Sequence, residues 1–350
     1  MLRIDGSVGE GGGQIIRTAI ALAAITGKAV EITNIRANRP NPGLSAQHLH
    51  AVRAVERISG GSTEGLALRS TRLAFTPGML KGFEGEIDIG TAGSITLLLQ
   101  CLVPAALFAD RTTKVRITGG TDVSWSPPME FYTHVFLPVL RELGCELQLD
   151  LKRRGYYPKG GGLVDLTVTP TRRLKGLVLR KPEHAVEITS HEHAVEITGV
   201  SHSCGLPAHV VDRQARAAKH VLKDAGYDAA IKTEPEERGT WTTGSGITLW
   251  SGYKSGSALG ERGKRAELVG EEAARGILTE LQAPGTVDVH LADQLVPYLA
   301  LATGNSEMRV REMTKHLETN LYITQQFLEV NFTVQKDERG EGAVLVIRKE

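Results

Sequence analysis

Residues 9–26 read GEGGGQIIRTAIALAAIT, a glycine-rich segment followed by an apolar run that contains a single arginine. The run is long enough for a helix, and because it is apolar on nearly every side we expect it at the centre of the fold. A short strand at residues 2–4 precedes the glycines, and an alternating strand at residues 29–34 follows the helix. Alternation of this kind is typical of a strand with one buried face.

The same order recurs twice along the chain. Residues 90–94 read GTAGS and lead into an apolar helix at 95–108 and a strand at 114–118. A third copy starts at Asp293 and reaches a strand at 308–310. A second, more amphipathic helix follows in each copy, at residues 49–58, 131–143 and 317–328.

We therefore predict an α/β (α+β) fold with a loose internal repeat. Three strand-helix-strand-helix units, at about 1–80, 81–175 and 280–350, would form one large domain. The alternative is that these are three unrelated α/β stretches.

The chain between the second and third units breaks this rhythm. It contains helix candidates at about 210–225 and 265–281 and strand candidates at 229–233 and 246–251. We predict that residues 180–278 form a small inserted α/β domain, and that residues 1–179 and 279–350 form the core domain.

A seven-residue sequence, EHAVEIT, occurs twice at the start of this insert, at residues 183–189 and 192–198. Its alternation fits a strand in both copies. Four histidines gather here, but their spacing matches no zinc motif, so we expect no metal site from it; they are His184, His191, His193 and His202.

The composition is that of an ordinary globular protein. Hydrophobic residues make up 41% of the 350 residues, and the formal net charge is +1, so the total charge does not indicate a partner. Three cysteines without CxxC spacing predict neither a disulfide framework nor a zinc knuckle. We see no signal peptide and no segment that could cross a bilayer, and we expect a cytoplasmic protein without membrane contact.

The glycines at residues 9–13 are suited to bind an anion. They let backbone N–H groups approach a phosphate, and the start of the following helix favours negative charge. The segment lacks the lysine of a Walker A loop, and we find no strand-loop-helix context for a Rossmann fingerprint. Glu10 would repel a phosphate unless a divalent cation lay between them, so Glu10 is a candidate metal ligand. The alternative is a tight turn with a solvated glutamate.

Three arginines follow this glycine-rich turn. Arg17 lies in the apolar helix, and Arg36 and Arg39 lie just after the next strand. Guanidinium groups bind phosphate in a bidentate manner, so the three could form a phosphate clamp to which Gln47 adds a polar contact. For each arginine alone, an ordinary salt bridge is the alternative.

His316 has a sequence context that suits a nucleophile. Thr314 is a candidate N-cap, which places His316 in the first turn of a helix, where the helix dipole disfavours imidazolium. A neutral imidazole can attack phosphorus and form a covalent intermediate. Asp293 could orient the ring by accepting its other N–H. The alternative is an ordinary histidine at a helix start.

Several ordered motifs together resemble the RNA 3′-terminal phosphate cyclase family, over nearly the whole chain. They are GEGGGQ at 9–14, IRANRPNPGL at 35–44, QHL at 47–49, GTAGS at 90–94, GGTD at 119–122, YPKGGG at 157–162, HLADQ at 290–294 and HLETN at 316–320. The resemblance implies three α/β units with a small inserted α/β domain, as predicted above.

The resemblance also implies an ATP-dependent reaction in three steps. A histidine takes AMP from ATP and becomes histidinyl-AMP, and the AMP then passes to an RNA 3′-terminal phosphate. The neighbouring 2′-hydroxyl closes a 2′,3′-cyclic phosphate and releases AMP. The implied cofactors are ATP and a divalent metal, Mg²⁺ or Mn²⁺, and the implied partner is RNA with a 3′-terminal phosphate.

Carried over by motif, His316 is the nucleophile and Glu10 contacts the metal. The residues implied to bind ATP or its phosphates are Arg17, Arg36, Arg39, Gln47, Pro127, His290, Asp293 and Gln294. His290 stands where relatives often have an aromatic residue that could stack on adenine, and histidine stacks less extensively.

Two other functions remain alternatives. Some relatives serve ribosome assembly without catalysis and lack the histidine, whereas His316 and Glu10 are both present here. The repeated unit is also similar to that of enolpyruvyl transferases, for which the arginines would suit a phosphorylated metabolite. The sequence leaves the oligomeric state open, with a homodimer as one option.

Overall fold

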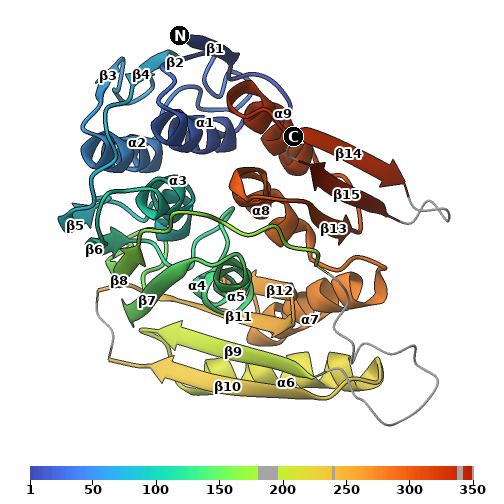
Figure 1. Ribbon diagram of the computed structural model, residues 1–350. Helices are drawn as coiled ribbons and strands as arrows, with labels where there is room; N and C mark the ends of the chain where they lie inside the picture. The colour runs from blue at the N-terminus through green and yellow to red at the C-terminus, as the bar shows by residue number, and fades with distance from the viewer. Residues whose placement is uncertain (180–195, 239–240, 337–341, 349–350) are drawn as a thin grey trace.

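The computed structural model describes residues 1–179, 196–238, 241–336 and 342–348 (Figure 1). The first copy of the EHAVEIT repeat and most of the second lie outside the described residues, as do His184, His191 and His193.

The first unit is a four-stranded sheet covered by two helices. Its elements are β1 (Leu2–Asp5), α1 (Gly13–Thr26), β2 (Val30–Thr33), α2 (Ala46–Ser59), β3 (Ser62–Glu64) and β4 (Leu73–Thr76). The strand order is β1-β2-β4-β3, and β1 and β2 are parallel with α1 between them. The strand-loop-helix context that we did not find in the sequence is therefore present around the glycines, because β1 extends from Leu2 to Asp5.

The second unit repeats this plan. Its elements are β5 (Glu84–Asp88), α3 (Ile95–Leu107), β6 (Thr113–Gly119), α4 (Met129–Phe131), the π-helical turn η1 (Tyr132–Phe136), α5 (Leu137–Glu142), β7 (Glu146–Arg153) and β8 (Gly162–Thr169). The strand order β5-β6-β8-β7 matches that of the first sheet, again with a parallel first pair. The single amphipathic helix predicted at 131–143 is divided by the π-turn.

In the third unit, the position of the first strand is filled by an earlier part of the chain. Its own elements are α8 (Val289–Leu301), β13 (Ser306–Val310), α9 (Lys315–Phe327), β14 (Asn331–Lys336) and β15 (Ala343–Arg348), in the order β13-β15-β14. Lys175 and Val178 form parallel bridges to Thr303 and Glu307 beside β13. All three sheets thus share one order of strand directions, and each ends in a hairpin. The sequence predicted the first strand of this hairpin in the second and third units, at residues 146–151 and 330–334, where β7 and β14 lie.

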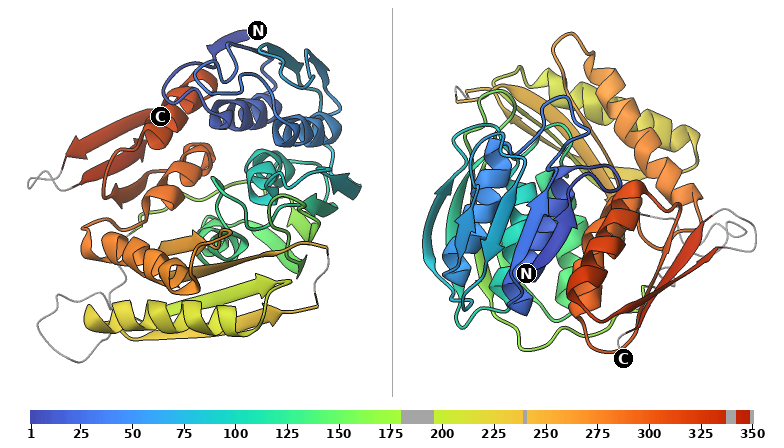
Figure 2. Two further views of the ribbon diagram at one scale, coloured as in Figure 1. Left: turned by 180° about the vertical axis from the view of Figure 1, so that it is seen from behind. Right: turned by 90° about the horizontal axis from the view of Figure 1, so that it is seen from above.

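The helices that open the three units form the centre of the molecule. In α1, α3 and α8 nearly every side chain is buried, as the all-round apolar sequences predicted. Seen from above, α1 and α9 lie side by side (Figure 2), which brings the glycine-rich loop close to the start of α9. The α/β prediction is confirmed.

The remaining elements form a separate sheet at the base of Figure 1. They are β9 (Ile197–Cys204), α6 (His209–Asp224), β10 (Ala229–Glu236), β11 (Gly244–Ser251), β12 (Lys254–Leu259) and α7 (Ala266–Gln282), with strand order β10-β9-β11-β12. This sheet has a hydrophobic cluster of its own, which includes Leu222, Leu249 and Ile277. The division into a core and an inserted domain stays a prediction, and α7 continues to Gln282, past the expected boundary at 278. Among the described residues, no helix combines the length and the apolar character needed to span a membrane.

Candidate active site

His316 lies in the first turn of α9, as predicted. The Thr314 side chain caps this helix by accepting a hydrogen bond from the Leu317 N–H at 3.1 Å. The His316 side chain is 45% exposed, so the ring can be reached from solvent. The helix start therefore both fixes the position of this histidine and presents it to a ligand.

Gln14, at the start of α1, orients the His316 ring. The Gln14 Nε2 donates to the backbone carbonyl of His316 at 2.8 Å, and this contact fixes which way the amide points. Gln14 Oε1 then accepts a hydrogen bond from His316 Nδ1–H. Nδ1 therefore carries a proton, and Nε2 is the nitrogen that faces Glu10.

Glu10 and Arg39 lie on the Nε2 side of the ring. Glu10 Oε2 is 3.0 Å from His316 Nε2 and 3.0 Å from Arg39 Nη2. Arg39 also lies over the glycine-rich loop, since a Cβ placed on Gly12 would be 3.3 Å from its Nη2. Both Glu10 contacts use Oε2, so Oε1 can face another ligand.

The electrostatic surroundings favour a neutral His316. Burial lowers the pKa of the ring, Glu10 raises it, and the remaining contributions lower it further, with a lowered pKa as the net result. Those remaining contributions come from Arg17, His290 and Arg39. A neutral ring is the form that can act as a nucleophile.

Arg17 is a buried cation on the inner side of the site. It is 9% exposed, and its Nε donates to Gln100 Oε1 of α3 at 2.9 Å. Burial lowers the pKa of Arg17 to about 10, so the guanidinium remains charged at neutral pH. Asp293 raises the pKa of Arg17, and Arg17 lowers that of Asp293, although burial outweighs both effects.

Sequence reasoning did not single out His48 for a role, although the structure places it against the glycine-rich loop. A Cβ on Gly13 would lie 2.0 Å from His48 Nε2, so Gly13 is required for the ring to fit. His48 Nδ1 accepts a hydrogen bond from the Ser45 N–H at 3.1 Å. Burial, Arg17 and Arg36 lower the pKa of His48 to about 3, so this ring is neutral.

Arg36 lies at the edge of this group. Its Nη1 donates to the Gly43 carbonyl at 2.9 Å, and its backbone is in the left-handed region, with φ 54°. Burial and the nearby Arg39 lower the pKa of Arg36. Of the three predicted arginines, Arg39 lies against the glycine-rich loop and Arg17 lies in the helix that follows it, whereas Arg36 lines a small separate cavity of about 240 Å³.

Gln47 and Pro127 meet the loop that opens the second unit. Gln47 Oε1 accepts from the Ser94 N–H at 3.3 Å, and the Pro127 carbonyl accepts from the Thr96 hydroxyl at 2.8 Å. Both residues thus lie at the start of α3, which is a second helix N-terminus suited to anions.

Asp293, in α8, does not contact the His316 ring as the sequence suggested. The His316 ring nitrogens meet Gln14 and Glu10, so the orienting role that the sequence suggested for Asp293 belongs to Gln14. Asp293 instead uses its backbone carbonyl to accept from Asn320 Nδ2 at 2.6 Å. Burial, Asp288 and Glu10 raise the pKa of the Asp293 carboxyl well above its ordinary value, which Arg17 partly offsets.

The other two predicted α8 residues flank Asp293. Gln294 Nε2 donates to the His290 carbonyl at 3.1 Å, while Gln294 Oε1 is buried without a hydrogen-bond partner. His290 is exposed and close enough to His316 to lower its pKa.

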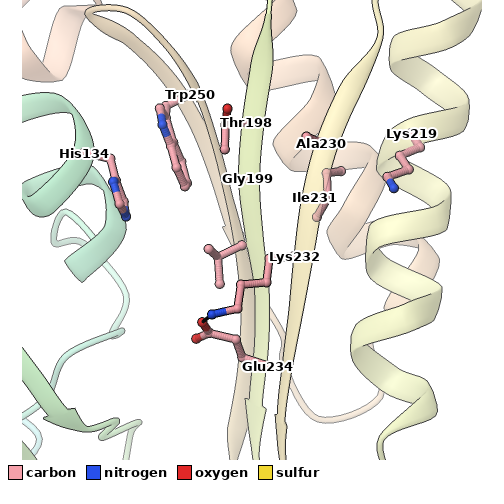
Figure 3. Close-up of a pocket in the computed structure, with 10 residues that line it drawn as sticks. His134, Thr198, Gly199, Lys219, Ala230, Ile231, Lys232, Glu234 and Trp250 are labelled. Atoms are coloured by element: carbon pink, nitrogen blue, oxygen red, sulfur yellow. Dashed lines mark ion pairs between the residues drawn. The ribbon is translucent and has the colours of Figure 1, made fainter.

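A cavity formed by other described residues lies away from the His316 site. It has a volume of about 570 Å³ and opens on the β9–β10 face of the separate sheet (Figure 3). The His134 and Trp250 rings stack at its side with centroids 4.2 Å apart, and Lys232 pairs with Glu234 at its end. The candidate residues around His316 do not line it.

Comparison with known proteins agrees with the resemblance. A family model described as RNA 3′-terminal phosphate cyclase matches residues 8–334. The RNA 3′-terminal phosphate cyclase of Archaeoglobus fulgidus is 50% identical over 328 residues, which cover 94% of this chain and 96% of the relative. That of Methanosarcina acetivorans is 51% identical over 350 residues, with 97% and 98% covered. That of Pyrococcus furiosus is 46% identical over 353 residues, with 100% and 99% covered. The chain therefore belongs to the RNA 3′-terminal phosphate cyclase family.

Proposed function

We propose that this protein is an ATP-dependent enzyme of the ligase class that converts an RNA 3′-terminal phosphate into a 2′,3′-cyclic phosphate through histidinyl-AMP. The observation that carries the proposal is the setting of His316: a half-exposed ring, held by Gln14 on one nitrogen, with Glu10 on the other. Family membership makes a cyclase of this kind the expected enzyme.

In the first step, His316 Nε2 attacks the α-phosphorus of ATP. A nitrogen–phosphorus bond forms as the bond to pyrophosphate breaks, and the ring gains positive charge. The hydrogen bond from Nδ1 to Gln14 Oε1 strengthens as this charge develops. Arg39 and the N–H groups at the start of α1 would stabilise the negative charge on the phosphates.

In the second step, an oxygen of the RNA 3′-phosphate attacks the same phosphorus, and the bond to His316 breaks. The ring is restored, and the RNA end now carries AMP. In the third step, the 2′-hydroxyl attacks the terminal RNA phosphorus, loses its proton and displaces AMP. Splitting the reaction in this way makes AMP the leaving group of the ring closure.

Glu10 fits the expected divalent metal, Mg²⁺ or Mn²⁺. Mg²⁺ is held in nucleotide sites by one or two carboxylates together with substrate phosphates, and Glu10 supplies one carboxylate at the mouth of the glycine-rich loop. The metal would neutralise negative charge on the phosphates. With Glu10 drawn toward that ion, His316 Nε2 would be free to attack.

Adduct formation tests this proposal. The protein is incubated with α-labelled ATP and Mg²⁺, and then with an RNA oligonucleotide that ends in a 3′-phosphate. We expect a covalent, acid-labile nucleotide adduct. The RNA should then carry a terminal phosphate that phosphatase can no longer remove. A non-catalytic role in RNA processing or ribosome assembly would give neither product.

Replacement of Gln14 tests the orienting contact. In Gln14→Ala the ring loses the acceptor for Nδ1–H, so we expect adduct formation to slow by about 10–100-fold, the usual effect of removing such a partner. The KM for ATP should change little, because Gln14 contacts the histidine. Gln326→Ala, on the outer part of the same helix as His316, is the control and should keep the original rate. An unchanged rate in Gln14→Ala would show that Gln14 does not orient the His316 ring for the reaction.

The pH profile tests the charge state of His316. The folded pKa is lowered, so the neutral fraction is already high at neutral pH and falls only as the pH drops. We expect the rate of adduct formation to rise with pH, with a midpoint below about pH 6.5, the ordinary pKa of histidine. A midpoint above pH 7 would show that the ring is protonated where we infer that it is neutral.

A further inference from the structure

Away from the His316 site, three buried ligand-type atoms converge between the second unit and the separate sheet. They are Asp122 Oδ1, Glu130 Oε2 and His202 Nε2, which lie within 4.8 Å of one another. The three side chains are 0%, 6% and 0% exposed. Asp122 follows β6, Glu130 lies in α4, and His202 lies in β9, so the group joins two parts of the fold.

Each of these three atoms is buried and makes no hydrogen bond. His202 Nε2 is 3.6 Å from Asp122 Oδ1 and 3.7 Å from Glu130 Oε2, which is too long for a hydrogen bond. Buried polar atoms without partners are costly and rare. Three that point at one spot indicate that something is bound between them.

The other polar atom of each of these three side chains has a partner. Arg154 contacts the second oxygen of Asp122 at 3.4 Å and the second oxygen of Glu130. The Tyr156 hydroxyl is 2.6 Å from His202 Nδ1. Partners of this kind orient metal ligands in known sites, because they fix each carboxylate and the plane of the imidazole ring. In the tautomer that donates Nδ1–H to the Tyr156 hydroxyl, the lone pair of Nε2 points at the two carboxylate oxygens.

The charged side chains around this cluster leave one negative charge unbalanced, which favours a bound cation. Asp122, Glu130 and Glu234 bring three negative charges, and Arg154 and Lys232 bring two positive ones. A proton on His202 would balance the charge, but it would lie at distances that form no hydrogen bond. Two ligands each about 2.1 Å from a tetrahedral Zn²⁺ are about 3.4 Å apart, close to the observed separations.

We propose that Asp122, Glu130 and His202 bind one divalent transition-metal ion of the Zn²⁺ type, which fastens the separate sheet to the second unit. One imidazole and two carboxylates suit Zn²⁺ better than Mg²⁺, which demands octahedral geometry and keeps its waters. Glu234 is the register partner of His202 between β9 and β10 and holds Arg154 at 2.9 Å. Glu234 also lines the 570 Å³ cavity (Figure 3).

Zinc binding can be measured in a chain from which competing histidines are removed. The parent variant carries His184→Ala, His191→Ala, His193→Ala and His316→Ala, which removes a possible zinc-binding run and the other candidate site. After chelation and dialysis, this parent should bind one Zn²⁺ tightly, as counted by elemental analysis. No tightly bound Zn²⁺ in the parent would overturn the proposal.

Two further variants of this parent identify the ligands. Asp122→Asn and His202→Gln should each weaken Zn²⁺ binding by at least about 100-fold, and Glu10→Gln should not change it. Equal affinity in all variants would overturn the proposal. Zn²⁺ should also raise the thermal unfolding midpoint of the parent by several degrees. It should not change the unfolding midpoint of either ligand variant.

A spectroscopic measurement guards against variants that fail to fold. Co²⁺ added to the parent should give the strong visible absorption bands of a tetrahedral site with nitrogen and oxygen ligands, and one equivalent of Zn²⁺ should abolish them. Absence of these bands in the folded parent would contradict a site of this geometry. Because the readouts are metal binding and unfolding, they do not depend on cyclase activity.

Discussion

His316→Ala is expected to lose the nucleotide adduct completely and to slow cyclisation by at least about 10³-fold, since removal of a covalent nucleophile is among the most damaging changes to an enzyme. The fold should persist. His316 is half exposed, and its ring contacts are polar and lie at the edge of the core. Rates are measured with labelled ATP and a 3′-phosphorylated oligonucleotide.

The matched control for this variant is His220→Ala. His220 is a helical histidine in α6 whose side chain is 77% exposed and pairs with its helical neighbour Asp224. It should keep full activity and the same unfolding midpoint. Full cyclase activity in His316→Ala, with the control also active, would refute the assignment of the nucleophile.

Glu10→Gln is expected to have the second largest effect. The amide keeps the size of the side chain but loses the negative charge that would hold a divalent ion and that now pairs with Arg39. We expect adenylation to fall by about 10²-fold and to require a higher concentration of Mg²⁺ or Mn²⁺. The measurement is the rate of adduct formation as a function of metal concentration.

Glu64→Gln provides the comparison for this experiment. Glu64 lies in β3, its side chain is 79% exposed, and its ion pair with Arg72 is long, at 4.0 Å. Its substitution should leave the metal dependence as in the original chain. If Glu10→Gln kept the original metal dependence while the protein stayed folded, Glu10 would not be a metal ligand.

The local parts of the site could be predicted from the sequence. An N-cap threonine two residues before a histidine fixes that histidine in the first turn of a helix, and the structure confirms Thr314 in this role. The glycines at 9–13 likewise lead directly into a buried helix. Such features depend on neighbours within a few residues, which the sequence displays.

Contacts between distant residues could not be predicted in the same way. Gln14 and His316 are 302 positions apart, and no local pattern distinguishes Gln14 from Asp293 as the partner of the ring. The first strand position of the third sheet is filled from residues 175–178, although the rest of that sheet follows the insert. Pairing across such separations is set by packing of the whole fold.

The buried cluster at Asp122 shows the same limitation. Within the insert, the histidine spacing gave no metal motif, and the structure places His202 beside acidic side chains from another unit. Tyr156, which orients His202, lies 46 positions away. A site assembled from three segments leaves no spacing pattern in any one of them.

The most direct test of the central claim is to locate the labelled nucleotide on the protein. After reaction with α-labelled ATP and Mg²⁺, the protein is digested under mildly alkaline conditions, and the labelled peptide is sequenced by mass spectrometry. We predict AMP on the imidazole of His316, in the peptide that includes the start of α9. Label on a lysine or on another histidine, or no covalent label at all in an active preparation, would contradict the account.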